Sequence, residues 1–146
     1  MSRPILCLDF DGVVHSYTSG WKGARNIPDP PVPGAIEFML AALGAGYDVV
    51  IHSSRARYFG GIWAMRRWLR KNSRIATSHV VEGYEHQFVE DVWDRESLTP
   101  GLPCLFQVRF ARWKPAAIVT LDDRGWRFDG TFPDPKALMA AKPWNK

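Results

Sequence analysis

Pairs of acidic residues stand directly after two apolar segments of the sequence. Asp9 and Asp11 follow an apolar run that begins at Ile5, and Asp122 and Asp123 follow a later run of the same kind. Carboxylates gathered in one pocket repel one another, and they are costly there unless a hard cation neutralises them. If the two pairs meet in space, their spacing therefore predicts a site for Mg²⁺.

Two other polar residues stand at the edges of apolar runs. Ser53 follows the run 47–52, and Lys114 precedes the run 116–121. A serine hydroxyl can donate a hydrogen bond, and a lysine ammonium supplies positive charge. Because ligands of open α/β sheets bind at the carboxyl ends of the strands, we expect these side chains and the acids at one site.

The elements that must position these residues follow from the apolar pattern. Apolar, β-prone runs predict strands at residues 5–9, 47–52, 76–81, 104–110 and 116–121, and a short edge strand at 126–128. Helices are predicted at residues 34–45, 60–72, 85–93 and 135–141. Residues 15–33 are rich in Gly and Pro and predict a long loop. The alternation of strands and helices predicts an α/β fold with a mainly parallel sheet.

Length and composition indicate one ordinary globular domain over residues 1–146. The apolar fraction is 46% and the charged fraction is 23%, which excludes a disordered or fibrous chain. No apolar run approaches the length of about 20 residues that a membrane span requires, so we expect no membrane contact. Cys7 and Cys104 lie far apart without metal-type spacing, which favours buried thiols and a cytoplasmic protein.

The positive charge of the chain is modest and partly clustered. The net charge of +4 favours a polyanionic partner. Arg66, Arg67, Arg70 and Lys71 surround tryptophans within the predicted helix 60–72. Such a cluster either binds nucleic acid or forms the solvated face of an amphipathic helix, and we favour the second interpretation.

The acidic and polar residues also carry a family resemblance. The segment Asp9-Phe10-Asp11-Gly12, then Ser53, Lys114 and the pair Asp122-Asp123, match in order the four motifs of the haloacid dehalogenase superfamily. The chain resembles a small hydrolase of this superfamily over residues 5–124. The resemblance implies a Rossmann-like three-layer sandwich with a mainly parallel central sheet. It implies no substantial cap domain, because the intervals between motifs leave little room for one.

The resemblance implies a phosphatase that works through an aspartyl-phosphate. Asp9 would be the nucleophile, and Asp11 would protonate the leaving oxygen and later deprotonate water. Ser53 would donate a hydrogen bond to the phosphoryl group, and Lys114 would neutralise charge on this group and on Asp9.

By the same resemblance, Mg²⁺ would be held by Asp9, by the backbone carbonyl of Asp11 and by the later acidic pair. Asp122 is favoured as the direct ligand and Asp123 as a ligand through water, although the assignment is open to reversal. Gly12 would let the turn bring Asp11 beside the phosphate.

Two positions depart from the commonest pattern or extend it. Val13 stands where many relatives have Thr. Arg55 follows Ser53 by two positions, similar to the Ser-Gly-Arg of polynucleotide end-processing phosphatases, with Ser54 in place of the Gly. We expect Gly12, Ser54 and Arg55 to contact substrate; the alternative for Arg55 is an exposed position on a loop.

Residues of the long loop are further candidates for substrate contact. Relatives use this loop as a flap over the phosphate, and it carries His15, Tyr17, Trp21, Lys22 and Arg25. Each of these side chains either contacts substrate or anchors the loop.

The expected substrate is a phosphorylated nucleotide or the phosphorylated end of a nucleic acid, because a capless site is open and the chain is basic. One alternative is a small-metabolite phosphatase acting on sugar phosphates. Another is a non-catalytic binding protein on the same fold. A receiver-type signalling module is disfavoured because its paired acids lie near the first strand, whereas Asp122 and Asp123 come last. The expected assembly is a monomer or a small homo-oligomer.

Overall fold

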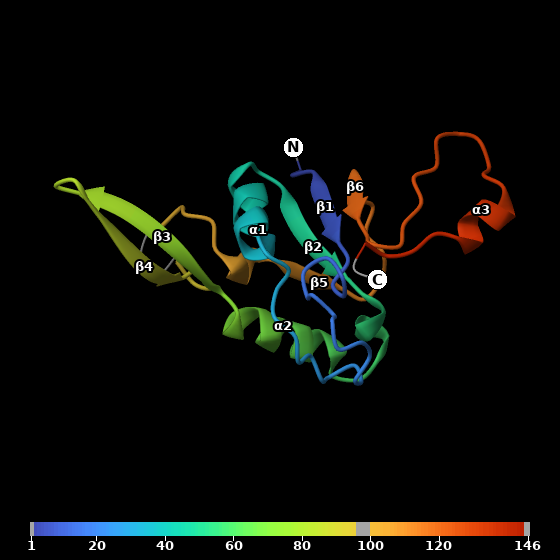
Figure 1. Cartoon of the computed structure of the whole chain (residues 1–146), viewed down its shortest axis with the longest axis horizontal. Coiled ribbons are helices and arrows are strands. Elements are labelled where there is room, and N and C mark those ends of the chain that lie inside the picture. Colours follow the sequence, from blue (N-terminus) through green and yellow to red (C-terminus); the bar gives the residue numbers. More distant parts are fainter. Residues whose placement is uncertain (1, 96–99, 145–146) are drawn as a thin grey trace.

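The structure is a computed structural model that describes residues 2–95 and 100–144 (Figure 1). The strands are β1 (Ile5–Leu8), β2 (Asp48–His52), β3 (Arg74–Val81), β4 (Tyr84–Asp91), β5 (Arg109–Ala111) and β6 (Val119–Leu121). The α-helices are α1 (Ala35–Gly44), α2 (Gly61–Lys71) and α3 (Pro135–Met139), and the 3₁₀ turns are η1 (Ser54–Arg57) and η2 (Leu105–Gln107).

A four-stranded parallel sheet forms the centre of the molecule, with strand order β5-β2-β1-β6. Leu8 is paired with Ile51 of β2 on one side and with Leu121 of β6 on the other. The carboxyl ends of these three strands therefore coincide, and the polar residues that follow them meet at one edge of the sheet. The predicted α/β fold with a parallel sheet is confirmed.

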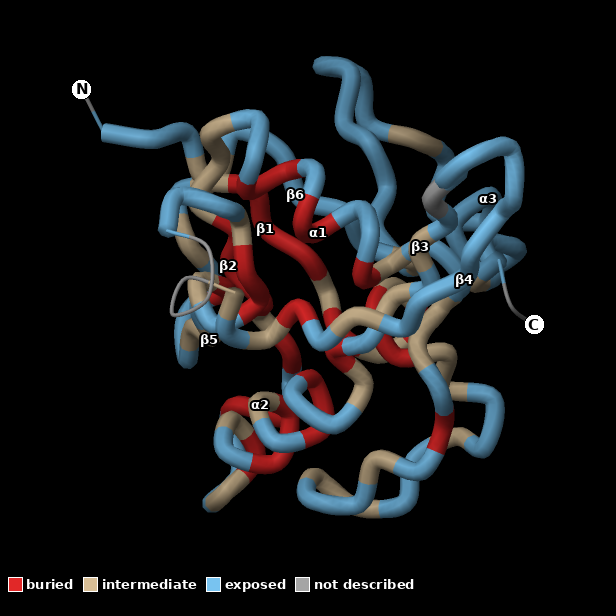
Figure 2. Tube along the Cα trace, turned by 90° about the vertical axis from the view of Figure 1, so that its left-hand side faces the viewer, coloured by how far each residue is buried: buried red, intermediate tan, exposed pale blue. Residues whose placement is uncertain are grey.

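The core lies between one face of the sheet and two helices. Leu6 and Leu8 of β1 point to the same face, and they pack in one cluster with Met39 of α1 and Met65 of α2. Cys7, between them in sequence, is buried on the opposite face outside this cluster. Figure 2 shows buried residues along β1, β2 and α2, with mostly exposed residues around them. The two longer helices thus cover one face of the sheet. The short helix α3 has no buried residue and is not part of the core.

Most of the region 85–93, predicted as a helix, is instead the second strand of a hairpin, β4, which ends at Asp91. β3 pairs with β4 in antiparallel fashion over their whole length, and Glu82 and Gly83 form the turn between them with φ of 52° and 83°. Positive φ at both central residues is typical of a type I′ hairpin turn. The helical prediction was wrong because the turn at Glu82 and Gly83 was not recognised. Residues 84–91 form backbone pairs with β3 instead. The hairpin projects away from the central sheet (Figure 1).

Other predicted elements are shorter than expected or absent, among them the strand 116–121, of which only Val119–Leu121 (β6) forms. The predicted strand 104–110 divides into the turn η2 and the short strand β5, since Leu105 is buried in a 3₁₀ turn rather than in a ladder. Residues 126–128 form no strand. The terminal helix, predicted for 135–141, ends at Met139, and its first turn is capped by the side chain of Asp134. No helix in the described parts of the chain is long and apolar enough to cross a bilayer.

Candidate active site

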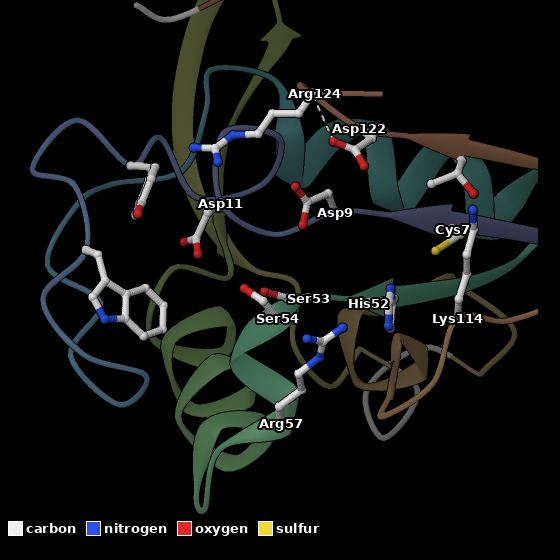
Figure 3. A pocket seen from close by; sticks show the side chains of 13 residues that line it. Cys7, Asp9, Asp11, His52, Ser53, Ser54, Arg57, Lys114, Asp122 and Arg124 are labelled. Atoms are coloured by element: carbon white, nitrogen blue, oxygen red, sulfur yellow. Dashed lines mark hydrogen bonds between the residues drawn. The ribbon is translucent and has the colours of Figure 1, made fainter. Parts of the chain in front are cut away.

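A pocket of about 370 Å³ lies at the carboxyl ends of β1, β2 and β6 (Figure 3). It is lined by Cys7, Asp9, Asp11, Tyr17, Trp21, His52, Ser53, Ser54, Arg57, Lys114, Thr120, Asp122 and Arg124. The lining includes all four residues expected to be catalytic, together with Ser54 and one acid of the later pair. The parallel register brings them together, because their host strands end at the same level.

Three carboxylates converge on one side of this pocket. Asp9, Asp122 and Asp123 each offer an oxygen, and these oxygens lie within 4.8 Å of one another. The pairing of β1 with β6 causes this approach: the backbone N–H of Asp9 donates to the carbonyl of Leu121 at 2.9 Å, so the residues after both strands are neighbours.

Burial and mutual repulsion perturb two of these acids. Burial raises the pKa of Asp9 to about 7, and the neighbouring acids add to this effect, although the backbone N–H of Phe10 donates to Asp9 Oδ1 at 2.8 Å. Burial also raises the pKa of Asp123, with Arg124 acting in the opposite sense. The charged forms of both acids are therefore disfavoured while no cation is bound.

The donor set fits a hard divalent cation. Asp123 Oδ1 is buried and has no hydrogen-bond partner among the described residues, which is costly for a carboxylate unless a ligand occupies it. The ligand atoms that this cluster offers to a metal ion are all carboxylate oxygens, and Mg²⁺ prefers oxygen ligands. Asp122 Oδ1 meanwhile accepts from the backbone N–H of Arg124 at 2.8 Å. The unpartnered oxygen thus belongs to Asp123, the acid that we expected to act through water.

Gly12 makes room for this cluster. Its φ is +84°, and a Cβ at this position would overlap the carboxylate of Asp123. Gly12 does not line the main pocket but a shallower neighbouring one, beside Asp123. The absence of a side chain at Gly12 therefore leaves space for the Asp123 carboxylate. This role is additional to the predicted one, in which Gly12 gives the turn its conformational freedom.

Asp11 is held by two cationic or polar side chains. His15 Nδ1 lies 2.8 Å from Asp11 Oδ1, and Arg55 Nε donates to Asp11 Oδ2 at 2.8 Å. Burial raises the pKa of Asp11, but the hydrogen bonds from His15 and Arg55 outweigh this effect and hold the pKa below its ordinary value. Asp11 is therefore a carboxylate in this structure.

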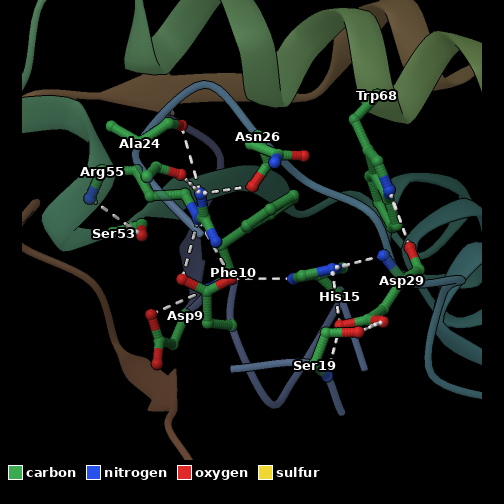
Figure 4. A network of polar contacts seen from close by, with 12 residues as sticks. Asp9, Phe10, His15, Ser19, Ala24, Asn26, Asp29, Ser53, Arg55 and Trp68 are labelled. Atoms are coloured by element: carbon green, nitrogen blue, oxygen red, sulfur yellow. Dashed lines mark hydrogen bonds and ion pairs between the residues drawn. The ribbon is translucent and has the colours of Figure 1, made fainter. Parts of the chain in front are cut away.

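His15 links Asp11 to the far side of the loop (Figure 4). It is fully buried, and its Nε2 accepts from the backbone N–H of Asp29 at 3.2 Å, so Nδ1 carries the proton that it donates to Asp11. The Asp29 carboxylate in turn accepts from the backbone N–H of Ser19 at 2.8 Å. The Trp68 indole donates to the Asp29 carbonyl at 3.0 Å. His15 thus anchors the loop and contacts a candidate catalytic residue.

Arg55 is buried rather than exposed, which contradicts the alternative that placed it on the surface. Its side chain has 0% exposure, and Nη1 donates to the carbonyls of Gly23 at 2.8 Å and Ala24 at 3.2 Å (Figure 4). Arg55 does not line the pocket, whereas the exposed Arg57, two residues later, does. Arg55 therefore holds Asp11 and the loop segment 23–24 in place. Its expected contact with substrate remains a prediction.

Ser53 and Lys114 lie on different sides of the pocket (Figure 3). Ser53 Oγ accepts from the backbone N–H of Arg55 at 3.2 Å and caps η1, so its hydroxyl proton is available to a ligand. The Lys114 ammonium forms no ion pair with a described carboxylate; its charge acts on Cys7 and on His52. Burial lowers the pKa of His52, and the charges of Arg57 and Lys114 lower it further.

Several lining residues were not found from the sequence. Arg57, Thr120 and Arg124 face the pocket, and their spacing beside Ser53 and the acid pair was the available signal. Their types alone are common on protein surfaces, so they did not stand out.

No family model, curated protein or solved structure gives a significant match to the chain.

Proposed function

We propose that the chain is a Mg²⁺-dependent phosphohydrolase of the haloacid dehalogenase superfamily, acting through an aspartyl-phosphate on Asp9. The observation that carries this proposal is the convergence of the carboxylates of Asp9, Asp122 and Asp123 within 4.8 Å. Ser53 and Lys114 line the pocket that holds Asp9, which supports the role of phosphoryl binding.

Asp9 is positioned for attack. Its Oδ1 accepts the backbone N–H of Phe10, which orients the carboxylate and leaves Oδ2 as the nucleophilic atom. In the first step an Asp9 oxygen bonds to phosphorus while the bond from phosphorus to the leaving oxygen breaks. The leaving oxygen takes a proton from Asp11, which must bind one before this step.

In the second step Asp11 acts as a base. Its carboxylate takes a proton from a water molecule whose oxygen bonds to phosphorus, and the acyl-phosphate bond breaks to release phosphate and Asp9. The hydrogen bonds from His15 and Arg55 keep Asp11 ionised and fixed in orientation, which suits this step.

Asp9, Asp122 and Asp123 would hold Mg²⁺ together with the backbone carbonyl of Asp11. When bound, the ion supplies positive charge to the nucleophile and to the phosphoryl oxygens. The side chains of the chain itself supply the remaining charge: Ser53 donates to a phosphoryl oxygen, and Lys114 and Arg57 attract the anionic substrate to the pocket.

The site supports two substrate classes. We propose phosphorylated nucleotides or nucleic-acid ends first, because three cations and two aromatic residues line the pocket and the hairpin β3–β4 does not cover it. A phosphorylated small metabolite such as a sugar phosphate is the second candidate, since about 370 Å³ lies within the range of small-ligand sites.

A trapping experiment tests the covalent step. Protein mixed with a ³²P-labelled phosphomonoester and Mg²⁺ is quenched with acid, and the label on the protein is counted. We expect label on the wild-type chain, more label on Asp11→Asn because its second step is slow, and none on Asp9→Asn. Turnover without any labelled protein would contradict the aspartyl-phosphate.

A further inference from the structure

A second hollow lies next to the active-site pocket. It has a volume of about 480 Å³ and is formed by the loop segment 22–26 together with Tyr58 and Phe59. The two pockets adjoin at a pair of aromatic rings: Trp21 lines the first, Tyr58 lines the second, and their ring centroids are 5.7 Å apart. We call the second hollow the loop groove.

Three aromatic rings around the loop groove are exposed. Phe59 is 93% exposed, Tyr58 is 55% exposed and Trp21 is 46% exposed. They belong to two separate segments that meet beside the candidate active site. Apolar rings that gather in the open at the rim of a site are typical of a binding surface.

The loop groove is also positively charged. Lys22 and Arg25 line it and are exposed, and neither forms an ion pair with a described carboxylate. Arg57 and Arg124 are exposed in the adjoining pocket. Exposed cations therefore line both of the adjoining pockets.

The loop that carries this path is held in place by Arg55. The Arg55 guanidinium binds the carbonyls of Gly23 and Ala24 and stacks on the ring of Trp21, with its Cζ 4.7 Å from the ring centroid. The groove therefore exists before a ligand arrives, which lowers the entropy cost of binding.

We propose that the loop groove binds the nucleotides next to the terminal phosphate of a single-stranded polynucleotide. This inference rests on the proposed phosphohydrolase function and specifies its substrate. The terminal phosphate lies at Asp9, a neighbouring base stacks on the exposed rings of Tyr58 and Phe59, and the next backbone phosphate meets Lys22 and Arg25. Stacking surfaces combined with backbone-binding cations are the usual means by which proteins hold single strands.

Two other ligands fit the loop groove less well. A mononucleotide or sugar phosphate is accommodated by the first pocket and leaves Phe59 and Arg25 without a function. An acidic phosphopeptide could pair its charges with Lys22 and Arg25, but it has no planar base to stack on the exposed rings of Tyr58 and Phe59. The groove therefore favours a polynucleotide.

The test compares a long and a short substrate. Phosphate release is measured from a 5′- or 3′-phosphorylated ten-residue oligothymidylate and from p-nitrophenyl phosphate, which is too short to extend from Asp9 into the groove. In Lys22→Ala/Arg25→Ala we expect kcat/KM on the oligonucleotide to fall at least about fivefold, and on p-nitrophenyl phosphate to change less than about twofold. Tyr58→Leu/Phe59→Leu should give the same pattern.

The matched control removes two positive charges elsewhere. Arg70→Ala/Lys71→Ala changes exposed residues of α2 that line neither of these pockets, and it should leave both substrates unaffected. A loss on the oligonucleotide in this control as large as in Lys22→Ala/Arg25→Ala would move the binding surface to α2 and overturn the proposal.

Equilibrium binding separates the groove from the chemistry. Fluorescence anisotropy of the labelled oligonucleotide with Asp9→Asn, at several salt concentrations, measures affinity without turnover. Loss of the contacts to this backbone phosphate in Lys22→Ala/Arg25→Ala should reduce the slope of log K against log salt by about 0.7. An unchanged salt slope, or an affinity for an acidic phosphopeptide equal to that for the oligonucleotide, would overturn the proposal that the groove binds a polynucleotide. Mg²⁺-dependent release from p-nitrophenyl phosphate would still uphold the phosphohydrolase function in that case. Oligonucleotide binding with no turnover of any substrate would uphold the groove and contradict the proposed function.

Discussion

The guanidinium of Arg55 donates from Nε to both carboxylate oxygens of Asp11, at 3.1 Å and 2.8 Å. The same group donates from Nη1 to the carbonyls of the loop that follows Trp21. One buried side chain therefore fixes both the proposed acid–base residue and the rim of the pocket. The arrangement couples the position of Asp11 to the conformation of the loop.

This coupling predicts separate effects for two neighbouring arginines. Arg55→Ala removes the charged donor of Asp11, which keeps only its bond from His15, and the donor of three carbonyls, so we expect a loss of about 3–5 kcal/mol in the free energy of unfolding. Arg55→Lys keeps the charge but not the planar guanidinium with its several donors, and should also lose stability and turnover.

Arg57→Ala removes an exposed pocket residue, and should raise KM with little change in stability. Urea unfolding and steady-state kinetics measure both quantities. Equal stability of the Arg55 and Arg57 variants would contradict the structural role of Arg55.

The hairpin β3–β4 is expected to be dispensable for chemistry. Its residues do not line the pocket of Asp9, and Val92 N–H donates to the Ser73 carbonyl at 2.9 Å, which closes the base of the hairpin. Replacing residues 75–90 by a short Gly-rich turn should therefore leave kcat/KM on p-nitrophenyl phosphate within about twofold of wild type. Circular dichroism checks that the remaining fold persists. A folded variant that has lost its activity would show that the hairpin acts as a cap.

Stability without metal should fall as the pH rises, because Asp9 binds its proton more tightly in the folded state. Its pKa is raised from 3.8 to about 7, so ionisation between these values lowers the stability of the folded chain, and the loss is complete above pH 7. In EDTA, Asp9→Asn should melt higher than wild type at pH 8 by at least about 3 °C, roughly the shift produced by 1 kcal/mol in a domain of this size. The advantage should shrink at pH 5 and when Mg²⁺ is added. A difference in melting temperature that is independent of both pH and Mg²⁺ would contradict the account of Asp9 as a buried carboxylate that binds the metal ion.

The central strands and the longer helices were predictable because their patterns are local. Buried parallel strands are continuous apolar runs, as at Ile5–Leu8 and Asp48–His52, and α1 has its buried residues at helical spacing. The convergence of the acids followed from the rule that polar residues at strand ends share one edge. The hairpin was not predicted, because the turn at Glu82 and Gly83 decides its conformation more than the residues of β4 do.

The role of Arg55 could not be predicted, because it depends on partners distant in sequence. Its guanidinium is surrounded by Asp11 and by carbonyls of residues 23–26, and no local pattern reveals that such a loop will fold over it. Arginine is mostly exposed, so composition argued for the surface. The same limit applies to His15, whose burial becomes evident only when Asp29 and Trp68 are in place.

The most direct test of the account is phosphate release with and without Mg²⁺, from wild type and from Asp9→Asn. The panel contains p-nitrophenyl phosphate, mononucleotides, sugar phosphates and 3′- or 5′-phosphorylated oligonucleotides. We predict release that requires Mg²⁺, stops in EDTA and falls at least about a thousandfold in Asp9→Asn, whose amide cannot act as the nucleophile. Release that persists in EDTA or in Asp9→Asn, or the absence of release from every member of the panel, would contradict the proposed function.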